Sequence, residues 1–172
     1  SHTPMTFLRG YAENMRLQDW LTKRIFPFEA QLQKEDIYYA TLLGAAEMAR
    51  YGIVSTSDMY FCGEEMVRAF SLSGLKANIS VSVTCMEERD YQTLPIYQEA
   101  KSLFANYHGA ENGRIRIDLS LHAEYTNSER IIRSLAEVNR NFGAVMHVHV
   151  SETQSEHEAR KARHNGRTPT QL

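Results

Sequence analysis

The residues with the clearest chemical potential gather near the C-terminal end of the chain. His147 and His149 alternate in a short apolar run, and Glu152 follows His149 by three residues. Histidine is the commonest metal ligand, and a carboxylate beside a metal-bound water can move its protons. The pattern suits a hydrolytic metal site, but alternating histidines also occur as hydrogen-bonded core or barrel residues, and the local pattern alone leaves both interpretations open. Both rings share one face of a regular strand, so only the spacing to Glu152 favours His149.

The elements that must position these residues alternate between helix and strand. Hydrophobic spacing and stop signals predict helices at 34–51, 64–73, 91–108, about 126–141 and 152–164, and strands at 53–58, 76–83, 114–121 and 143–150. Thr126 and Glu129 have the spacing of a capping box at the start of the fourth helix. Such alternation with short connections implies parallel strands and right-handed crossovers.

A doubly wound sheet and a (β/α)8 barrel both fit this alternation. No G-x-G-x-x-G turn follows a predicted strand, which weakens the dinucleotide-binding version of the sheet. Asp58, His122 and His149 each stand at the end of a predicted strand. Catalytic groups of a barrel lie at the C-terminal ends of its strands, so these positions favour the barrel.

Composition narrows the class of protein. The 172 residues carry 19 basic and 21 acidic side chains, a formal charge of −2, which gives no electrostatic reason to expect nucleic acid or a membrane as a partner. No apolar run approaches the roughly 20 residues that span a bilayer. The two cysteines make no disulfide framework, which fits a cytoplasmic protein.

Several segments, in this order and spacing, resemble one family. The chain resembles the S-adenosylhomocysteine/5′-methylthioadenosine deaminases and related aminohydrolases of the amidohydrolase superfamily. The matching segments are His2-Thr3-Pro4-Met5-Thr6-Phe7-Leu8-Arg9-Gly10-Tyr11-Ala12, Leu17-Gln18-Asp19-Trp20-Leu21, Ile25-Phe26-Pro27-Phe28-Glu29, Asp58-Met59-Tyr60, His122-Ala123-Glu124-Tyr125-Thr126 and His149-Val150-Ser151-Glu152-Thr153. Proline is common in the family at the position of Glu124.

The resemblance implies a role for each matched residue. His2 and His149 match ligands of a divalent metal, zinc or else iron(II), and Glu152 matches the catalytic carboxylate that shuttles protons. The implied substrate contacts are Glu29 at the ribose hydroxyls, His122 near the metal, and Trp20 beside the pocket. If this assignment holds, the rings of His2 and His149 converge at the open mouth of the parallel strands.

The resemblance also predicts how much of the barrel is present. The family's first metal-binding histidine would precede Ser1, and its last ligands follow strands six and eight, beyond Leu172. We therefore expect residues 1–172 to form a single fragment, from the end of barrel strand one to the helix after strand five, with about five parallel strands. Its metal site would be incomplete and the chain itself inactive. Open strand edges predict a homo-oligomer.

Three functions remain open from the sequence. The first is hydrolytic deamination of an adenosine-like nucleoside by a metal-activated water. The second is a related chlorohydrolase or a guanine or triazine deaminase, which uses the same attack. Glu29 favours the nucleoside, because a flat base or triazine has no ribose diol to bind. The third is a non-catalytic, self-associating structural fragment.

Overall fold

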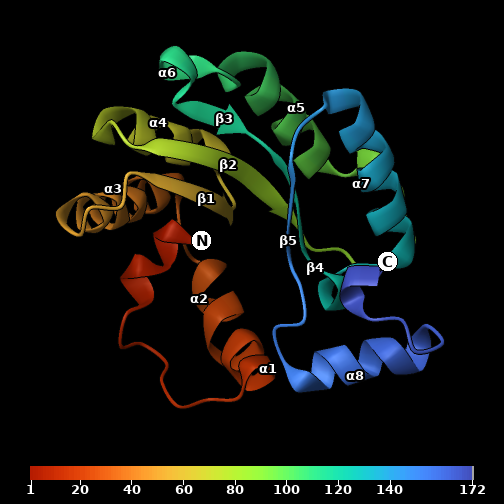
Figure 1. Cartoon of the computed structure of the whole chain (residues 1–172). Coiled ribbons are helices and arrows are strands. Elements are labelled where there is room, and N and C mark those ends of the chain that lie inside the picture. Colours follow the sequence, from red (N-terminus) through yellow and green to blue (C-terminus); the bar gives the residue numbers. More distant parts are fainter. Residues whose placement is uncertain (172) are drawn as a thin grey trace.

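The computed structural model describes residues 1–171, which form one parallel sheet that curls into part of a barrel (Figure 1). The strands pair in the order β1-β2-β4-β5, β3 also pairs with β2, and every pair is parallel. The predicted α/β architecture of about five parallel strands with flanking helices is confirmed. The strands are β1 (Ser55–Tyr60), β2 (Lys76–Val83), β3 (Ile115–Ile117), β4 (Leu119–Ala123) and β5 (Met146–His149).

Helices cover the outer face of this curled sheet, and a short N-terminal group lies across its open end (Figure 1). None of the helices within residues 1–171 is long and apolar enough to cross a membrane. The outer helices are α3 (Lys34–Arg50), α4 (Gly63–Ser73), α5 (Pro95–Tyr107), the single turn α6 (Ala110–Gly113) and α7 (Glu129–Phe142), whereas α8 (Gln154–Arg163) lies below the strands in the view of Figure 1. The N-terminal group comprises a 3-10 helix (Thr3–Leu8), α1 (Leu17–Trp20), a π-helical turn (Leu21–Ile25) and α2 (Phe26–Glu29); further 3-10 turns are Tyr91–Thr93, Glu124–Thr126 and Pro169–Gln171.

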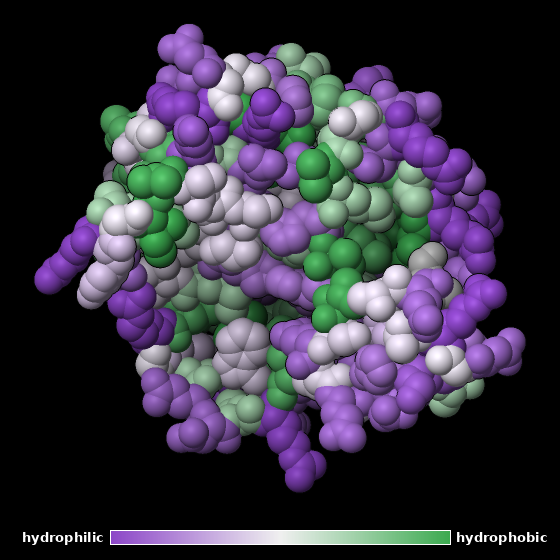
Figure 2. Space-filling model, viewed as in Figure 1, coloured by the Kyte–Doolittle hydropathy of each residue, from purple (hydrophilic) through white to green (hydrophobic). Residues whose placement is uncertain are grey.

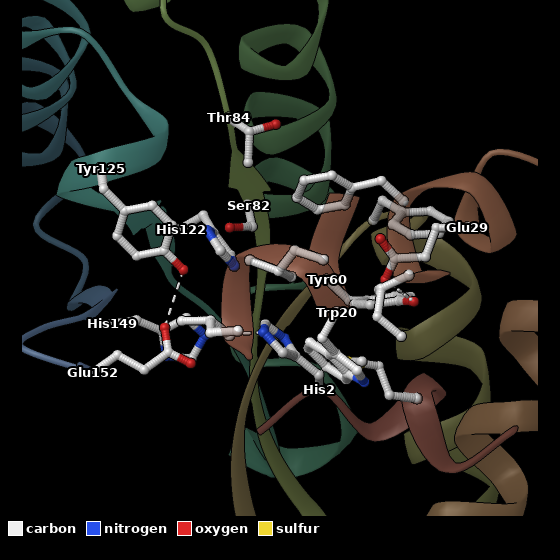
Figure 3. Close-up of a pocket in the computed structure, with 16 residues that line it drawn as sticks. His2, Trp20, Glu29, Tyr60, Ser82, Thr84, His122, Tyr125, His149 and Glu152 are labelled. Atoms are coloured by element: carbon white, nitrogen blue, oxygen red, sulfur yellow. Dashed lines mark hydrogen bonds between the residues drawn. The ribbon is translucent and has the colours of Figure 1, made fainter. Parts of the chain in front are cut away.

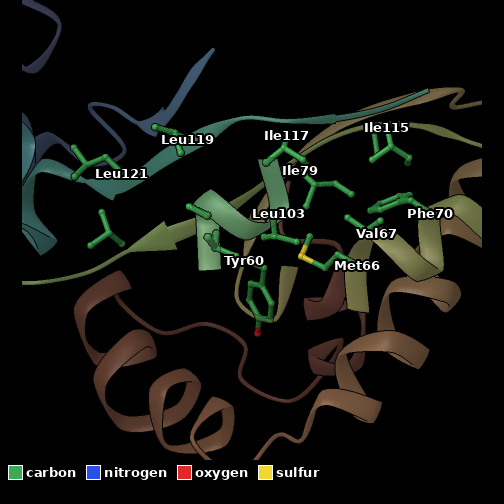
Figure 4. Packing of buried hydrophobic residues seen from close by; sticks show 14 of the residues in the cluster. Tyr60, Met66, Val67, Phe70, Ile79, Leu103, Ile115, Ile117, Leu119 and Leu121 are labelled. Carbon is green, nitrogen blue, oxygen red and sulfur yellow. The ribbon is translucent and has the colours of Figure 1, made fainter. Parts of the chain in front are cut away.

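The core lies between the sheet and the outer helices. Alternate side chains of β2, namely Ala77, Ile79, Val81 and Val83, point toward the helices and are buried. They meet buried apolar residues of the helices and of the neighbouring strands (Figure 4). These partners include Met66, Val67, Phe70, Leu103, Ile115, Ile117, Leu119, Leu121, Leu135 and Val138. The apolar side chains of β2 thus face the helices, whereas polar side chains such as Ser80 and Ser82 face the inside of the curled sheet.

Three predicted strands differ from the observed ones, and the one expected at 143–150 is the shorter β5, Met146–His149. The single strand expected at 114–121 is divided at Asp118, whose carboxylate accepts a hydrogen bond from Asn78 Nδ2 at 2.8 Å. The first strand was predicted to end at Asp58 but runs on to Tyr60. Asp58 is buried there and accepts hydrogen bonds from the backbone N–H and hydroxyl of Thr3. Its placement among strand-end residues was therefore wrong, and it holds the N-terminal segment in place.

The capping box predicted at Thr126 and Glu129 is also wrong. The Thr126 hydroxyl donates to the Ala123 carbonyl at 3.0 Å and ends a 3-10 turn, so it is not available to the helix. Ser128 instead has extended backbone geometry before α7, and its hydroxyl accepts from the Ile131 N–H at 3.3 Å. Two hydroxyl residues two positions apart made the cap ambiguous in the sequence.

Candidate active site

A cavity of about 330 Å³ opens where the strands end (Figure 3). All six residues singled out from the sequence line it, although they come from the N-terminal segment, the ends of strands and the loops beyond them. The polar and aromatic lining residues are His2, Trp20, Glu29, Tyr60, Phe61, Ser82, Thr84, His122, Tyr125, His149 and Glu152. Apolar side chains of the N-terminal group, Met5, Leu17, Leu21, Ile25 and Phe26, complete the wall.

The first residues of the chain lie alongside β1, and this pairing positions His2. The Ser1 amino group donates to the Ser57 carbonyl at 2.9 Å, and the Met59 N–H donates to the Ser1 carbonyl at 3.1 Å. The His2 ring then contacts the Met59 carbonyl through Nδ1. Because a carbonyl can only accept, Nδ1 carries the proton and Nε2 keeps a free lone pair.

Three imidazoles converge inside the cavity. His2 comes from the N-terminal segment, His122 from β4 and His149 from the end of β5. One ring nitrogen of each lies within 4.8 Å of those of the other two. The Nε2 atoms of His2 and His149 are 2.9 Å apart. The convergence expected for His2 and His149 is present, and His122 joins them as a third imidazole within reach of the same point.

The hydrogen bonds of His122 leave its Nε2 free as well. Its Nδ1 lies 3.2 Å from the Thr126 hydroxyl oxygen. The same hydroxyl donates to the Ala123 carbonyl and accepts from the Ala123 N–H, so Thr126 is itself held in place on the Nδ1 side of the ring, and His122 Nε2 has no hydrogen-bond partner among residues 1–171. A partner that fixes one ring nitrogen in this way orients the other toward a metal or substrate.

Burial keeps the three rings neutral at pH 7. It lowers the pKa of His2 and of His122 to about 4, with the neighbouring imidazoles adding to the effect. Burial also lowers the pKa of His149, which the Glu152 carboxylate opposes. Neutral imidazoles with free lone pairs are the donors that zinc and iron(II) accept, so the residues present fit such an ion.

His147 differs from His149 in its surroundings. Periodicity in the sequence could not show which of the two histidines belongs to the site, because they lie two residues apart on one strand, β5. His147 Nδ1 lies 3.4 Å from the Ser57 hydroxyl. It is not among the residues that line the cavity, whereas His149 is.

The loop after β5 presents Glu152 to the cavity. Helix α8 begins only at Gln154, because Thr153 and Glu156 form its capping box. The buried Glu156 carboxylate also accepts from the backbone N–H of Glu152 at 2.7 Å, which fixes the loop. The Tyr125 hydroxyl donates to Glu152 Oε2 at 3.1 Å, and this contact raises the tyrosine pKa further after burial. The carboxylate is thus held beside the histidines with one oxygen already bonded.

Glu29 lies on the opposite side of the cavity, at the end of α2. The Tyr60 hydroxyl donates to its Oε1 at 2.5 Å. Burial raises the pKa of Glu29, against the effect of this hydrogen bond. Trp20 lines the cavity from α1 nearby (Figure 3). Aromatic and carboxylate groups are therefore available for a ligand that extends away from the histidines.

Sequence reasoning gave Tyr60 and Tyr125 no role, although both lie in the segments that carry the resemblance. Each hydroxyl donates to a carboxylate that lines the cavity. No local sequence pattern indicates that a tyrosine will donate a hydrogen bond to these carboxylates, because the two carboxylates lie 31 and 27 residues away in sequence. The only signal was their position near the end of a strand.

Comparison with known proteins shows relatives over the whole chain. A family model described as the amidohydrolase family matches residues 1–172. A 5-methylthioadenosine/S-adenosylhomocysteine deaminase of Dictyoglomus thermophilum is 38% identical over 172 residues, which is 100% of this chain and 39% of the relative. A 5′-deoxyadenosine deaminase of Methanosarcina mazei is 39% identical over 166 residues, or 95% of this chain and 38% of the relative. The chain spans about two fifths of the length of these curated relatives.

Solved structures share the fold. An adenosine deaminase from Xanthomonas campestris with bound zinc matches with a TM-score of 0.83 at 24% identity, covering 96% of this chain and 38% of that one. A guanine deaminase from C. acetobutylicum matches with a TM-score of 0.82 at 16% identity, covering 96% and 41%. The curled sheet is accordingly part of the same kind of barrel. With the family model matched from the first residue to the last, this chain belongs to the amidohydrolase family.

Proposed function

We propose that this chain is a fragment of an enzyme that hydrolytically deaminates an adenosine-like nucleoside with the help of a divalent metal, zinc or else iron(II), and that the fragment by itself is inactive. The observation that carries the proposal is the meeting of His2 and His149 in one cavity, with Glu152 beside them. The names of two curated relatives, a 5-methylthioadenosine/S-adenosylhomocysteine deaminase and a 5′-deoxyadenosine deaminase, support the same reaction.

Some of these residues would bind the metal or act on its water, and others would bind the substrate. His2 and His149 would hold the ion through ring nitrogens. A divalent ion held there would lower the pKa of a water toward neutrality and so provide the nucleophile for the carbon that bears the amino group. Glu152 would take one proton from that water and deliver it to the purine ring nitrogen, and would then pass the second proton of the water to the amino group, which would leave as ammonia while the carbonyl forms. Tyr125 would keep the Glu152 carboxylate turned toward the ring.

Three other residues would bind the substrate. His122 would contact the base near the metal, and Trp20 would pack against the nucleoside. Glu29 would accept hydrogen bonds from the ribose hydroxyls, and its bond from Tyr60 fixes the carboxylate for this purpose. A flat guanine or triazine has no diol for Glu29, which supports a nucleoside over the chlorohydrolase and triazine alternatives.

Replacing Glu152 by glutamine in the complete enzyme tests the reaction directly. Glu152→Gln keeps the shape of the side chain but cannot take up a proton, so turnover of adenosine-like nucleosides should fall at least about 100-fold. Bound metal, measured by elemental analysis, should stay at the wild-type amount. Glu158→Gln is a matched control on the exposed side of α8 and should keep wild-type turnover. Undiminished turnover in Glu152→Gln would remove Glu152 from this role.

We also propose that the chain self-associates through the edge of its sheet. β5 pairs only with β4 among the strands of residues 1–171, so its other edge offers unpaired backbone groups. Val145 is 63% exposed just before it, and apolar side chains reach the surface between β5 and α7 (Figure 2). Light scattering after size-exclusion chromatography should give a mass above 19.7 kDa. A well-folded monomer would contradict the proposal.

The compartment proposed is the cytoplasm. Cys62 and Cys85 are both free thiols, as a reducing environment allows. A small-molecule substrate, rather than a nucleic acid or a membrane, suits the enclosed cavity and the formal charge of −2.

A further inference from the structure

A second hollow, of about 400 Å³, opens beside the active-site cavity. The two share four wall residues: Leu21, Phe26, Thr84 and Tyr125. Beyond this shared wall, the second hollow continues outward past Cys85 and Met86. We call the second hollow the annex. Because two of the shared residues belong to the N-terminal group that ends in Glu29, the annex opens next to the place proposed for the ribose.

The annex is built for a neutral, largely apolar group. Leu21 and Phe26 form one side, and Met86, which is 64% exposed, stands at the other. Its polar atoms come from uncharged groups such as the hydroxyls of Thr84 and Tyr125. Thioether and aromatic side chains favour contact with alkyl groups and sulfur.

Charge around the annex disfavours an anion. Within residues 1–171, no lysine or arginine belongs to the wall of the annex. The next residues along the loop after Met86 are Glu87 and Glu88, both acidic. Arg89 follows them, but its guanidinium lies 3.4 Å from Glu87 Oε2 and from the Thr93 carbonyl. A carboxylate that entered the annex would lose water without gaining a cation.

We infer that the annex binds the 5′ substituent of the nucleoside and selects a small neutral one, such as methylthio or a plain 5′-deoxy methyl, over an amino-acid tail. This inference rests on the proposed function, because the base and ribose must occupy the cavity for C5′ to face the annex. The name of one relative includes both kinds of substrate, 5-methylthioadenosine and S-adenosylhomocysteine, so that name does not indicate which of the two this protein prefers.

The decisive comparison uses those two nucleosides on the zinc-loaded complete enzyme that contains this chain. 5′-Methylthioadenosine should have a kcat/KM at least about tenfold higher than S-adenosylhomocysteine, whose tail carries a carboxylate. Binding is measured separately from turnover by the fluorescence of Trp20, the single tryptophan of the chain, which lines the cavity. The Kd values should show the same order.

A charge introduced at the mouth of the annex tests the physical reason. Met86→Arg supplies a guanidinium for the carboxylate, so the preference should shift at least about fivefold toward S-adenosylhomocysteine. Leu72→Arg is the matched control: Leu72 is 70% exposed on α4, outside both hollows, and the same added charge there should leave the preference unchanged.

The outcomes separate this inference from the proposed function. Equal kcat/KM and equal Kd for the two nucleosides would overturn the inference and leave the deaminase assignment standing. A wild-type preference that Met86→Arg fails to move would overturn the role of charge in the annex. Neither binding nor turnover of either nucleoside would overturn the proposed function and the inference together.

Discussion

The two faces of the curled sheet carry different kinds of side chain, apolar on the outer face and polar or ionisable at the cavity. On the outer face, alternate residues such as Ile79 and Ile117 are fully buried against helices and carry no polar atoms in their side chains. At the cavity, three imidazoles are crowded together and partly buried, with pKa values lowered by the loss of water. Burial of apolar side chains on the outer face stabilises the fold, whereas burial of the imidazoles on the inner face disfavours their protonated forms and adds no comparable stability. Stability and chemistry are thus divided between the two faces.

The largest effect expected from this comparison lies on the outer face. Phe70 of α4 is fully buried in the core, so Phe70→Ala removes its contacts and leaves a cavity. The free energy of unfolding should fall by about 3–5 kcal/mol, as measured by urea denaturation. His122→Ala on the inner face should change it by less than about 1.5 kcal/mol, since one net hydrogen bond is lost. Equal losses in the two variants would refute the division between faces.

Acidification should destabilise the inner face. In the unfolded chain histidine takes up a proton near pH 6.5, but His2 and His122 resist it in the folded protein until about pH 4. A pKa that is lower in the folded state gives stability that is complete above pH 6.5 and is lost as the pH falls toward 4. Each of the two rings should cost the metal-free protein on the order of 2–3 kcal/mol over this range, because one pKa unit corresponds to about 1.4 kcal/mol.

Two buried acids act in the opposite direction and must be separated from the histidines. Burial raises the pKa of Glu29 and of Asp58, so these groups favour the folded state as the pH falls. Comparing urea denaturation of wild type and the double variant His2→Gln/His122→Gln at pH 7 and pH 4.5 isolates the imidazoles. The double variant should lose less stability on acidification. An unchanged pH dependence would mean that the two rings are not desolvated as described.

The same division explains what could be predicted from the sequence. The outer face depends on local periodicity, so the alternation of helices and parallel strands from residue 34 onward was predicted, and β2 has the bounds expected at 76–83. The strand expected at 114–121 is nevertheless divided at Asp118, and the helices α1 and α2 of the N-terminal group were not predicted. The meeting of His2 with His149 joins residues 147 positions apart. Periodicity holds no such information, and only the order of motifs along the chain predicted it.

Residues that act through one hydrogen bond escaped prediction. Tyr60 and Tyr125 are defined by contacts with Glu29 and Glu152, which exist only once the barrel has formed. Asp58 was placed among strand-end residues for its charge, yet its role depends on the backbone of Thr3 coming alongside β1. Single polar contacts between distant segments are thus the least predictable part of the site.

The smallest expected effect concerns the start of α7, where the sequence favoured the wrong cap. Ser128→Ala removes the hydroxyl that accepts from the Ile131 N–H and donates to the Glu87 carbonyl at 2.9 Å. The free energy of unfolding should fall by about 1 kcal/mol in urea denaturation, as for other lost N-caps. Ser155→Ala, at an exposed position in the first turn of α8, should stay within about 0.5 kcal/mol of wild type. Removing a capping hydroxyl from a buried helix start leaves an N–H group unpaired, which lowers stability. If the Ser128→Ala protein were as stable as the Ser155→Ala protein, Ser128 would not be the N-cap of α7.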